Sequence, residues 1–307
     1  MADALRELAA PMTEPEVIGR ALSPAKVNFG LAVLGKRADG YHDIRSTMQA
    51  ISLFDRISMI APGRGEVRSD DSRLDPESNL MSVAARELAE RIEAPLDVDF
   101  MLTKRIPFAS GLGGGSSNAA AVLRLLCRHW SIDLSDERVA AAALATGSDV
   151  PFFLRGGPAR VSGRGERIDP LPRLPALWLV LVVPSLTLED KTARLFRALR
   201  ESDFQPGGSP AIQDSVPACA DNAFERPLYE LYPEIASIGS TLAHRTREKV
   251  RLSGAGPAHY VAFDRSDVAY DLIRSISRDD QFGACAIHLA RTIVGPGPLD
   301  MRRNTAQ

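Results

Sequence analysis

The sequence predicts an α+β fold divided into two domains. Runs of alternating apolar and polar residues, typical of strands, are interspersed with segments of helical periodicity along the chain. The 307 residues, 45% of them hydrophobic, are enough for two domains with a cleft. A proline-rich stretch at 170–176 separates two halves whose elements differ. We therefore expect a flexible extension at 1–20, a first domain at 21–172 and a second at 173–300.

In the first half, two strand-like segments flank Asp39-Gly40, a dipeptide typical of hairpin turns. A later helix is expected to have Ser135 as its N-cap, with acidic residues in its first turn. In chain order, the pattern predicts strands at 25–36 and 46–61, a helix at 79–92, a strand at 96–106 and helices at 117–130 and 135–147.

The second half begins with LWLVLVVP (177–184), an apolar run of the length of a buried strand. A loop rich in proline, glycine and serine follows at 205–220, and its sequence indicates no role. The last residues, MRRNTAQ, are expected to fray. The other predicted elements are helices at 189–201, 233–246 and 267–277 and strands at 259–263 and 284–294.

The composition argues against several classes of protein. A net charge of −2 gives no basic footprint for nucleic acid. No apolar run reaches the length of a transmembrane helix, and the N-terminus lacks the apolar core of a signal peptide. The three cysteines are widely spaced and form no metal motif, which favours a reducing compartment. We therefore expect a cytoplasmic protein with small-molecule substrates, no nucleic acid partner and no membrane.

The most informative segment is PFASGLGGGSSNAAA, residues 107–121. A flexible linker fits poorly, because the segment lies between a predicted strand and a predicted helix. A tight turn with a helix cap explains one or two glycines, but not Gly111, Gly113, Gly114 and Gly115 together. Residues without side chains let backbone N–H groups approach a phosphate chain, and a helix N-terminus adds partial positive charge.

This segment is therefore expected to bind phosphates. It lacks the lysine of GxxxxGK[ST] and the strand setting of GxGxxG, so the phosphate site is of a third type. Ser110, Ser116 and Ser117 offer hydroxyls for phosphate oxygens or Mg²⁺. No carboxylate cluster beside the segment identifies metal ligands, and no motif identifies an adenine pocket.

The same segment resembles the P-x3-GLGSSAA motif of the GHMP kinases, the superfamily of galactokinase, homoserine kinase and mevalonate kinase. Its triple glycine followed by SSNAA is similar to one branch, the 4-diphosphocytidyl-2-C-methyl-D-erythritol kinases. SPAKVNFGLAVLGKRADGYHDIRSTMQAISLFDRI (23–57) is similar to the N-terminal signature of that branch, and RLSGAGPAHYVAF (251–263) to the third superfamily motif. The resemblance extends from about residue 23 to about residue 293.

The resemblance implies a two-domain GHMP kinase fold. Its N-terminal, ATP-binding domain is similar to domain 2 of ribosomal protein S5, and its C-terminal domain is ferredoxin-like. It further implies ATP with Mg²⁺, and phosphorylation of the 2-hydroxyl of 4-diphosphocytidyl-2-C-methyl-D-erythritol in the non-mevalonate route to isopentenyl diphosphate. The ATP-binding residues that it implies are Pro107, Phe108, Ala109, Ser110, Gly111, Leu112, Gly113, Gly114, Gly115, Ser116 and Ser117.

Two charged residues are the candidate catalytic groups. Asp149, in TGSDVPFF, follows a helix stop and is expected to precede a buried strand; by residue type alone it is more typical of a turn or cap. Lys26, in SPAKVN, would by itself be a solvated lysine. The resemblance implies that Asp149 is the catalytic aspartate, acting as a base or by orientation, and that Lys26 keeps it ionised and stabilises the transferred group.

The acceptor site is expected to include residues from both halves. Asn28 lies two residues after Lys26 on the same strand face and could bind acceptor hydroxyls. A Tyr-His pair after a turn, Tyr41 and His42, is often only surface. The resemblance implies that Tyr41 stacks on the cytosine and that His42 binds its edge.

Thr192 and Phe196 share one helix face, where the alternative is a core phenylalanine beside an exposed threonine. The resemblance implies that this pair closes the cytosine pocket. Gly254 and Gly256, in SGAGP, would form a tight loop opposite the glycine segment, and Ala255 offers no hydroxyl there. Two other functions stay open: a GHMP kinase acting on homoserine or a mevalonate-type alcohol, and a non-catalytic, nucleotide-binding relative.

Overall fold

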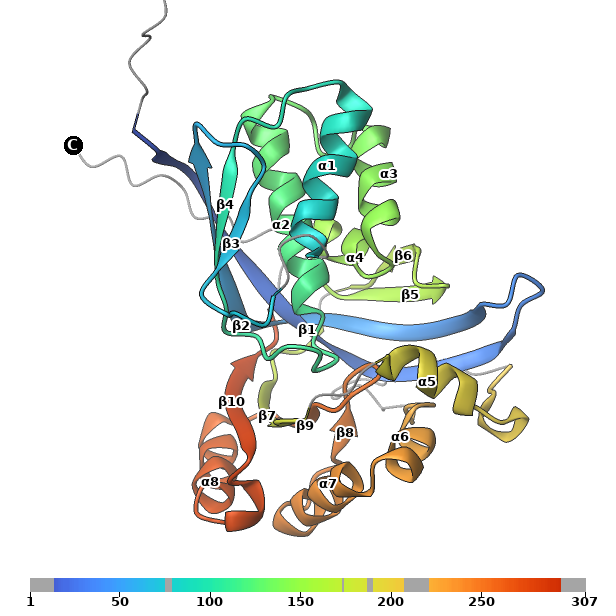
Figure 1. Cartoon of the computed structure of the whole chain (residues 1–307). Helices are drawn as coiled ribbons and strands as arrows, with labels where there is room; N and C mark the ends of the chain where they lie inside the picture. The colour runs from blue at the N-terminus through green and yellow to red at the C-terminus, as the bar shows by residue number, and fades with distance from the viewer. Residues whose placement is uncertain (1–13, 75–78, 173, 187–189, 207–220, 294–307) are drawn as a thin grey trace, which may run out of the picture.

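The computed structural model describes residues 14–74, 79–172, 174–186, 190–206 and 221–293. The chain folds into two halves, each made of one β-sheet with helices packed on it (Figure 1). This arrangement confirms the predicted α+β class. The extension at 1–13, most of the 205–220 loop and the tail from 294 lie outside the described residues. No helix in the described part of the chain is long and apolar enough to cross a membrane.

The first sheet is built around one long hairpin. Strands β1 and β2 pair along their whole length, with Lys36 opposite His42 across the turn that contains Gly40, at φ 84°. The sheet order is β3-β4-β2-β5-β6, with β1 on β2. Its strands are β1 (Glu16–Lys36), β2 (His42–Ala61), β3 (Val67–Ser69), β4 (Asp99–Thr103), β5 (Ala159–Gly163) and β6 (Arg167–Pro170).

Strand β1 begins inside the expected extension. Residues 16–20 already pair with the end of β2, because the alternating pattern starts earlier than the predicted residue 25. Further along, β1 is buried on both faces. Ala25, Val27 and Phe29 pack in a core cluster with residues of the second sheet, such as Leu179 and Tyr260. The hairpin therefore joins the two halves of the molecule.

Helices cover one face of the first sheet (Figure 1). The helix after the glycine segment begins at Gly114, three residues earlier than predicted, so glycines form its first turn. The predicted cap at Ser135 is wrong: Asp136 is the N-cap, and its carboxylate accepts from the N–H of Arg138. The four helices are α1 (Leu80–Ile92), α2 (Gly114–His129), α3 (Glu137–Thr146) and α4 (Val150–Arg155).

The strand expected after Asp149 is also wrong, because residues 150–155 form the short helix α4. An apolar run of this length does not by itself distinguish a buried strand from a buried helix. Pro151 lies in the first turn, where proline is favoured, and Phe152 and Phe153 are buried. The consequence is that Asp149 stands at a helix start.

The second sheet is antiparallel, in the order β10-β7-β9-β8, with helices on one face. Alternate residues of β7 enter different cores: Leu181 packs toward β1, and Val182 packs with Leu242 and Leu272 of the helices. Burial on both faces explains the continuous apolar run. The elements are β7 (Trp178–Pro184), α5 (Lys191–Ala198), α6 (Glu225–Leu231), α7 (Pro233–Arg245), β8 (Arg251–Leu252), β9 (His259–Phe263), α8 (Ser266–Ile276), β10 (Cys285–Arg291) and the 3₁₀ turns Glu201–Asp203 and Asp280–Phe282.

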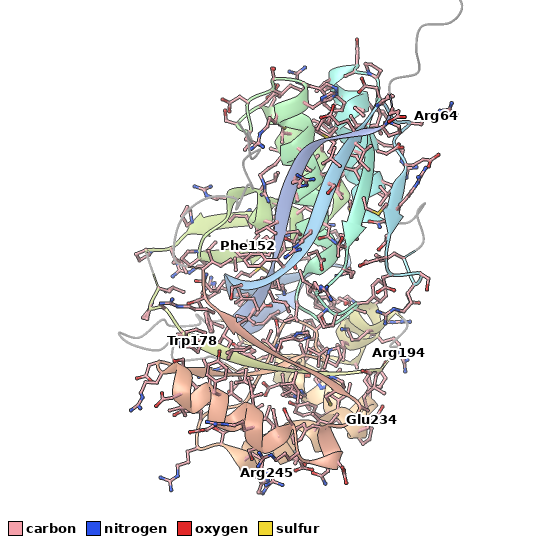
Figure 2. All side chains as sticks on the ribbon, turned by 90° about the vertical axis from the view of Figure 1, so that its left-hand side faces the viewer. Arg64, Phe152, Trp178, Arg194, Glu234 and Arg245 are labelled. Atoms are coloured by element: carbon pink, nitrogen blue, oxygen red, sulfur yellow. The ribbon has the colours of Figure 1, made fainter. Side chains whose placement is uncertain are left out.

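The two halves are in direct contact along β1. The Tyr260 hydroxyl donates to the carbonyl of Asn28 at 2.8 Å, and Leu31 forms an isolated bridge with Asn222. In Figure 2, Phe152 lies in the N-terminal half, while Glu234 and Arg245 lie toward the opposite end of the molecule. The glycine segment and the SGAGP loop both face this junction.

Candidate active site

The glycine segment and the SGAGP loop pack against each other. Gly111 has φ 82°, and a Cβ there would overlap the carbonyl oxygen of Ser253. The Ala258 N–H donates to the Ser110 carbonyl at 3.0 Å, and the Ser253 hydroxyl donates to the Gly111 carbonyl at 3.1 Å. The structure thus brings the two predicted loops together, and only glycine fits at position 111.

Lys26 lies directly beside the start of α2. Gly113, with φ 73°, is the N-cap of this helix, and a Cβ there would come 3.0 Å from Cγ of Lys26. The Lys26 ammonium donates to Oδ1 of Asn28 at 2.5 Å, and the Asn28 amide donates to the Ser46 hydroxyl at 2.7 Å. Asn28 thus holds the Lys26 ammonium within β1 and is itself held by Ser46 of the adjacent strand β2.

Asp149 faces Lys26 across the same site, with 3.8 Å between Oδ2 and Nζ. Its carboxylate makes no capping hydrogen bond to α4, so the simple cap expected from residue type does not describe it. Burial lowers the pKa of Lys26, which is 3% exposed, and the charge of Asp149 opposes that shift. The structure therefore places a buried cation against a partly exposed carboxylate.

Three adjoining cavities surround this pair. The central cavity, of about 660 Å³, is lined by Lys26, Asn28 and Asp149. A glycine-loop cavity of about 420 Å³ extends from it along α2 and shares Gly111 and Thr192 with it. The lining of the glycine-loop cavity includes Leu74, Asn79, Leu80, Lys104, Pro107, Phe108, Ala109, Ser110, Gly113, Gly114, Gly115 and Ser116.

An aromatic cavity of about 730 Å³ adjoins the central cavity on another side, lined by Tyr41, His42, Thr192 and Phe196. His42 stacks on Phe196, with ring centroids 4.9 Å apart and planes at 20°. Burial lowers the pKa of His42, as does the charge of Lys36, so the imidazole is neutral at physiological pH. The four residues predicted to bind the cytosine thus line one cavity, whereas Asn28 and Gly254 line the central cavity and Gly256 lines neither of the two.

Tyr41 is 52% exposed, and the guanidinium of Arg164 lies 3.5 Å from its ring centroid. Arg164 lines both the central and the aromatic cavities. Sequence reasoning missed this residue, which lies in the turn between β5 and β6. The signal available was a cation between two glycines, Gly163 and Gly165, both at positive φ.

Lys191 was missed as well. It begins α5, directly before Thr192, and lines the central cavity. Its ammonium donates to the carbonyl of Ala109 at 2.7 Å and also to the carbonyl of Gly256. Its proximity to Thr192 in the sequence was the available signal.

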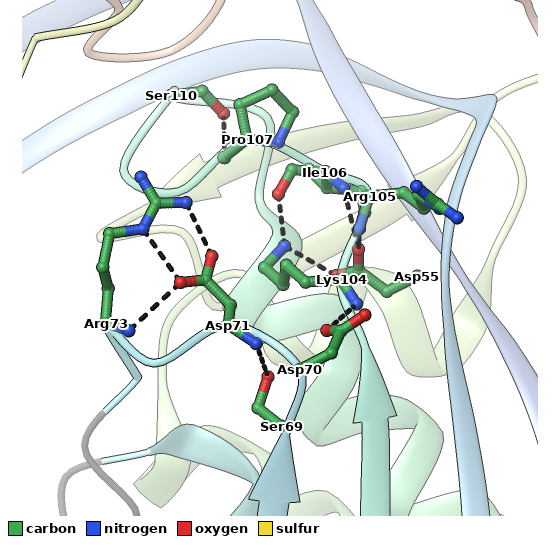
Figure 3. A network of polar contacts seen from close by, with 10 residues as sticks. All are labelled: Asp55, Ser69, Asp70, Asp71, Arg73, Lys104, Arg105, Ile106, Pro107 and Ser110. Atoms are coloured by element: carbon green, nitrogen blue, oxygen red, sulfur yellow. Dashed lines mark hydrogen bonds and ion pairs between the residues drawn. The ribbon is translucent and has the colours of Figure 1, made fainter.

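A buried ion pair supports the start of the glycine segment (Figure 3). Asp55, fully buried, accepts from the Lys104 ammonium at 2.8 Å and from the N–H groups of Arg105 and Ile106 at 2.7 and 2.8 Å. The Lys104 N–H donates to Asp70 at 2.7 Å. These bonds hold the backbone that leads into Pro107.

Comparison with known proteins agrees with this geometry. Residues 79–157 match the family model for the GHMP kinases N terminal domain. A 4-diphosphocytidyl-2-C-methyl-D-erythritol kinase of Dehalococcoides mccartyi is 37% identical over 91% of this chain and 99% of its own length. The Bacillus subtilis protein of the same name is 36% identical over 76% and 84%.

Solved structures give the same result. The crystal structure of a 4-(cytidine 5'-diphospho)-2C-methyl-D-erythritol kinase is similar with a TM-score of 0.74 and 32% identity, over 90% of this chain and 100% of that one. Homoserine kinase from Cytophaga hutchinsonii, at 16% identity, a TM-score of 0.66 and coverage of 94% and 99%, shares the fold. The predicted two-domain GHMP kinase fold is thereby confirmed. The chain is a kinase and belongs to the 4-diphosphocytidyl-2-C-methyl-D-erythritol kinase family of the GHMP kinases.

Proposed function

We propose that the protein transfers the γ-phosphoryl group of ATP to the 2-hydroxyl of 4-diphosphocytidyl-2-C-methyl-D-erythritol, in the non-mevalonate route to isopentenyl diphosphate. One observation carries this proposal. The Lys26–Asp149 pair lines a central cavity that lies between a glycine-loop cavity and an aromatic cavity. A phosphoryl donor and an aromatic-bound acceptor can therefore meet at the pair.

ATP fits the glycine-loop cavity. The start of α2, from Gly113 to Ser116, presents backbone N–H groups and a helix N-terminus to phosphate oxygens, while the Ser117 N–H already donates to the Gly113 carbonyl. The apolar side chains of Leu74, Leu80 and Phe108 line the same cavity and suit an adenine ring. The phosphate chain then runs along the glycines toward Lys26.

Protein oxygen atoms near the phosphate chain of the nucleotide suit Mg²⁺. Mg²⁺ usually takes one or two protein oxygens together with substrate phosphates and water. No cluster of three histidine, cysteine, aspartate or glutamate residues occurs in the described ranges. Ser116 lines the cavity, and the buried hydroxyl of Ser117 has no hydrogen-bond partner in the structure. We propose that Ser116 and Ser117 would hold the ion, which would neutralise phosphate charge.

The acceptor hydroxyl binds at Asp149, which accepts its hydrogen bond and orients its oxygen toward the γ-phosphorus. As the new P–O bond forms and the bond to ADP breaks, the hydroxyl proton passes to the carboxylate. Lys26, whose ammonium lies 3.8 Å from the Asp149 carboxylate, compensates charge on the transferred group. Alignment and charge compensation supply most of the catalysis in such transfers.

The cytidine diphosphate part fits the aromatic cavity. Tyr41 offers a ring face, and the neutral His42 offers one donor and one acceptor for the base edge. Thr192 and Phe196 close the other side of this pocket. Arg164 lies between this pocket and the central cavity, which suits a diphosphate that spans the two.

The test is a direct assay of the purified chain with Mg²⁺-ATP and single alcohols, following ADP release. We expect turnover with 4-diphosphocytidyl-2-C-methyl-D-erythritol, and phosphorus NMR of the product should place the phosphate on the 2-oxygen. Turnover with homoserine or mevalonate instead would replace the proposed substrate. Nucleotide binding without turnover of any alcohol would favour a non-catalytic role.

A further inference from the structure

Lys191 is a buried cation held by the two loops of the site. The residue is 7% exposed and lies at the first position of α5. Its ammonium donates to carbonyl oxygens of Ala109, in the glycine segment, and Gly256, in the SGAGP loop. Neither partner is charged. The side chain therefore lies where the glycine segment, the SGAGP loop and α5 meet.

The charges around Lys191 leave room for an anion. Its cavity is also lined by Lys26, Arg164, Asp149 and Asp190. Asp149 pairs with Lys26, and within the described ranges no ion pair includes Lys191. Burial, and secondarily the charge of Lys26, lower the pKa of Lys191 to about 7. A buried ammonium without a counter-ion is costly, so an anionic ligand would be stabilised here.

The position of Lys191 identifies the anion. Ala109, which accepts its hydrogen bond, lines both the central cavity and the glycine-loop cavity, as do Gly111 and Gly113. A phosphate chain that follows the glycines toward Lys26 and Asp149 must pass this point. The carbonyl oxygens that hold the ammonium are neutral acceptors, which a phosphate oxygen can replace with a stronger, charge-assisted bond.

We propose that Lys191 binds the terminal phosphate of the nucleotide, as a second cation beside Lys26. The inference rests on the proposed function only in placing a nucleotide in the glycine-loop cavity. The phosphate draws the ammonium from a backbone carbonyl and favours its charged form. Binding therefore takes up a proton at a pH where Lys191 is neutral in the free protein, and affinity falls as the pH rises above about 7.

The test measures binding of the β,γ-imido analogue of ATP and of ADP, with Mg²⁺ and without any alcohol, by titration calorimetry at pH 6.5 and 8. Two buffers of different ionisation enthalpy report the protons taken up. Lys191→Met removes the charge, Lys191→Arg keeps it at all pH values, and Lys249→Met is the control. Lys249 is an exposed lysine paired with Asp221.

We expect Lys191→Met to weaken binding of the imido analogue at pH 6.5 about tenfold or more, and binding of ADP much less. Lys191→Arg should keep tight binding but lose the proton uptake that the wild type shows at pH 8. The phosphates contribute no proton uptake at this pH, because their second pKa is about 6 and they are already ionised. The control variant Lys249→Met should match the wild type in both affinity and proton uptake.

Two results would overturn the inference. If Lys191 only fastens the two loops together, Lys191→Met lowers the unfolding temperature while analogue affinity and its pH dependence stay as in the wild type. If the methionine variant does not fold, the arginine variant decides. Proton uptake on analogue binding by Lys191→Arg equal to that of the wild type would also overturn the inference. Since no alcohol is present, these results do not depend on the substrate. Turnover of the cytidyl alcohol with no role for Lys191 would leave the proposed function standing.

Discussion

The ammonium of Lys26 on β1 lies 3.8 Å from the carboxylate of Asp149, which stands at the start of α4. The two residues come from opposite ends of the N-terminal half, and the close approach of Gly113 to Lys26 fixes their common position at the N-terminus of α2. The pair lies in the central cavity, which adjoins both the glycine-loop cavity and the aromatic cavity.

Replacement of Asp149 tests its role in the transfer. Asp149→Asn keeps the shape and hydrogen-bonding capacity but removes the charge, so we expect kcat to fall by about 10²–10⁴-fold. Binding of the imido analogue of ATP should change little, because the glycine segment supplies those contacts. Steady-state kinetics and calorimetry measure the two effects. A kcat within a few-fold of the wild type would remove Asp149 from the reaction.

Tyr41→Ala tests the cytosine pocket. Stacking of a base on an aromatic ring contributes about 1–3 kcal/mol, so KM for the cytidyl substrate should rise by roughly 5- to 150-fold with kcat much less affected. KM for ATP should not change and serves as the internal control. An unchanged KM for the cytidyl substrate would place the base elsewhere.

Arg164→Gln tests recognition of the diphosphate. Loss of a charge-assisted hydrogen bond costs about 1.5–3 kcal/mol, so KM for the cytidyl substrate should rise at least tenfold, with a smaller rise for an analogue that lacks the diphosphate. Arg167→Gln is the matched control, because Arg167 is on the same hairpin but lines neither the central nor the aromatic cavity. Equal effects of the two replacements on both compounds would count against a contact with the diphosphate.

Folding stability should depend on His259, which is buried in β9 and whose ring Nε2 lies 2.9 Å from the Tyr229 hydroxyl. Burial lowers the pKa of His259 to about 4, so the unfolded chain binds a proton below pH 6.5 that the folded chain does not. The free energy of unfolding should therefore fall between pH 6.5 and 4, by about 3 kcal/mol from this group.

Urea unfolding across that pH range measures the effect. His259→Gln should be less stable at neutral pH and should show a shallower decline with acid. The exposed His244 gives the control variant His244→Gln, which should retain the wild-type slope. A slope in the His259 variant as steep as in the wild type would show that other groups cause the acid sensitivity.

Sequence patterns predicted most helices and strands. They also predicted the site residues that lie in the N-terminal signature, the glycine segment and the SGAGP loop. The glycines could be found because their spacing has a direct local meaning at a helix N-terminus. Lys26 was identified through the family resemblance, and Asn28 through its place two residues further along the same strand face. The helix after Asp149 was mistaken for a strand because a short apolar run has no distinctive period. Helix α6 escaped notice because seven residues carry too little pattern.

The missed site residues share a different cause. Lys191 becomes buried because two loops distant in sequence cover it, and its local pattern gives no sign of that. The guanidinium of Arg164, in the turn between β5 and β6, lies over the ring of Tyr41, in the turn between β1 and β2. This is a tertiary contact. Asp55 gains its role from the N–H groups of Arg105 and Ile106, far along the chain. Such contacts follow from the fold and not from local spacing.

A crystal structure with the imido analogue of ATP, Mg²⁺ and the cytidyl alcohol tests the central claim most directly. The account predicts phosphates along residues 111–117, a terminal phosphorus in the central cavity, and the acceptor hydroxyl within hydrogen-bonding distance of Asp149. A phosphate chain bound away from the glycine segment, or an acceptor hydroxyl out of reach of Asp149, would contradict it.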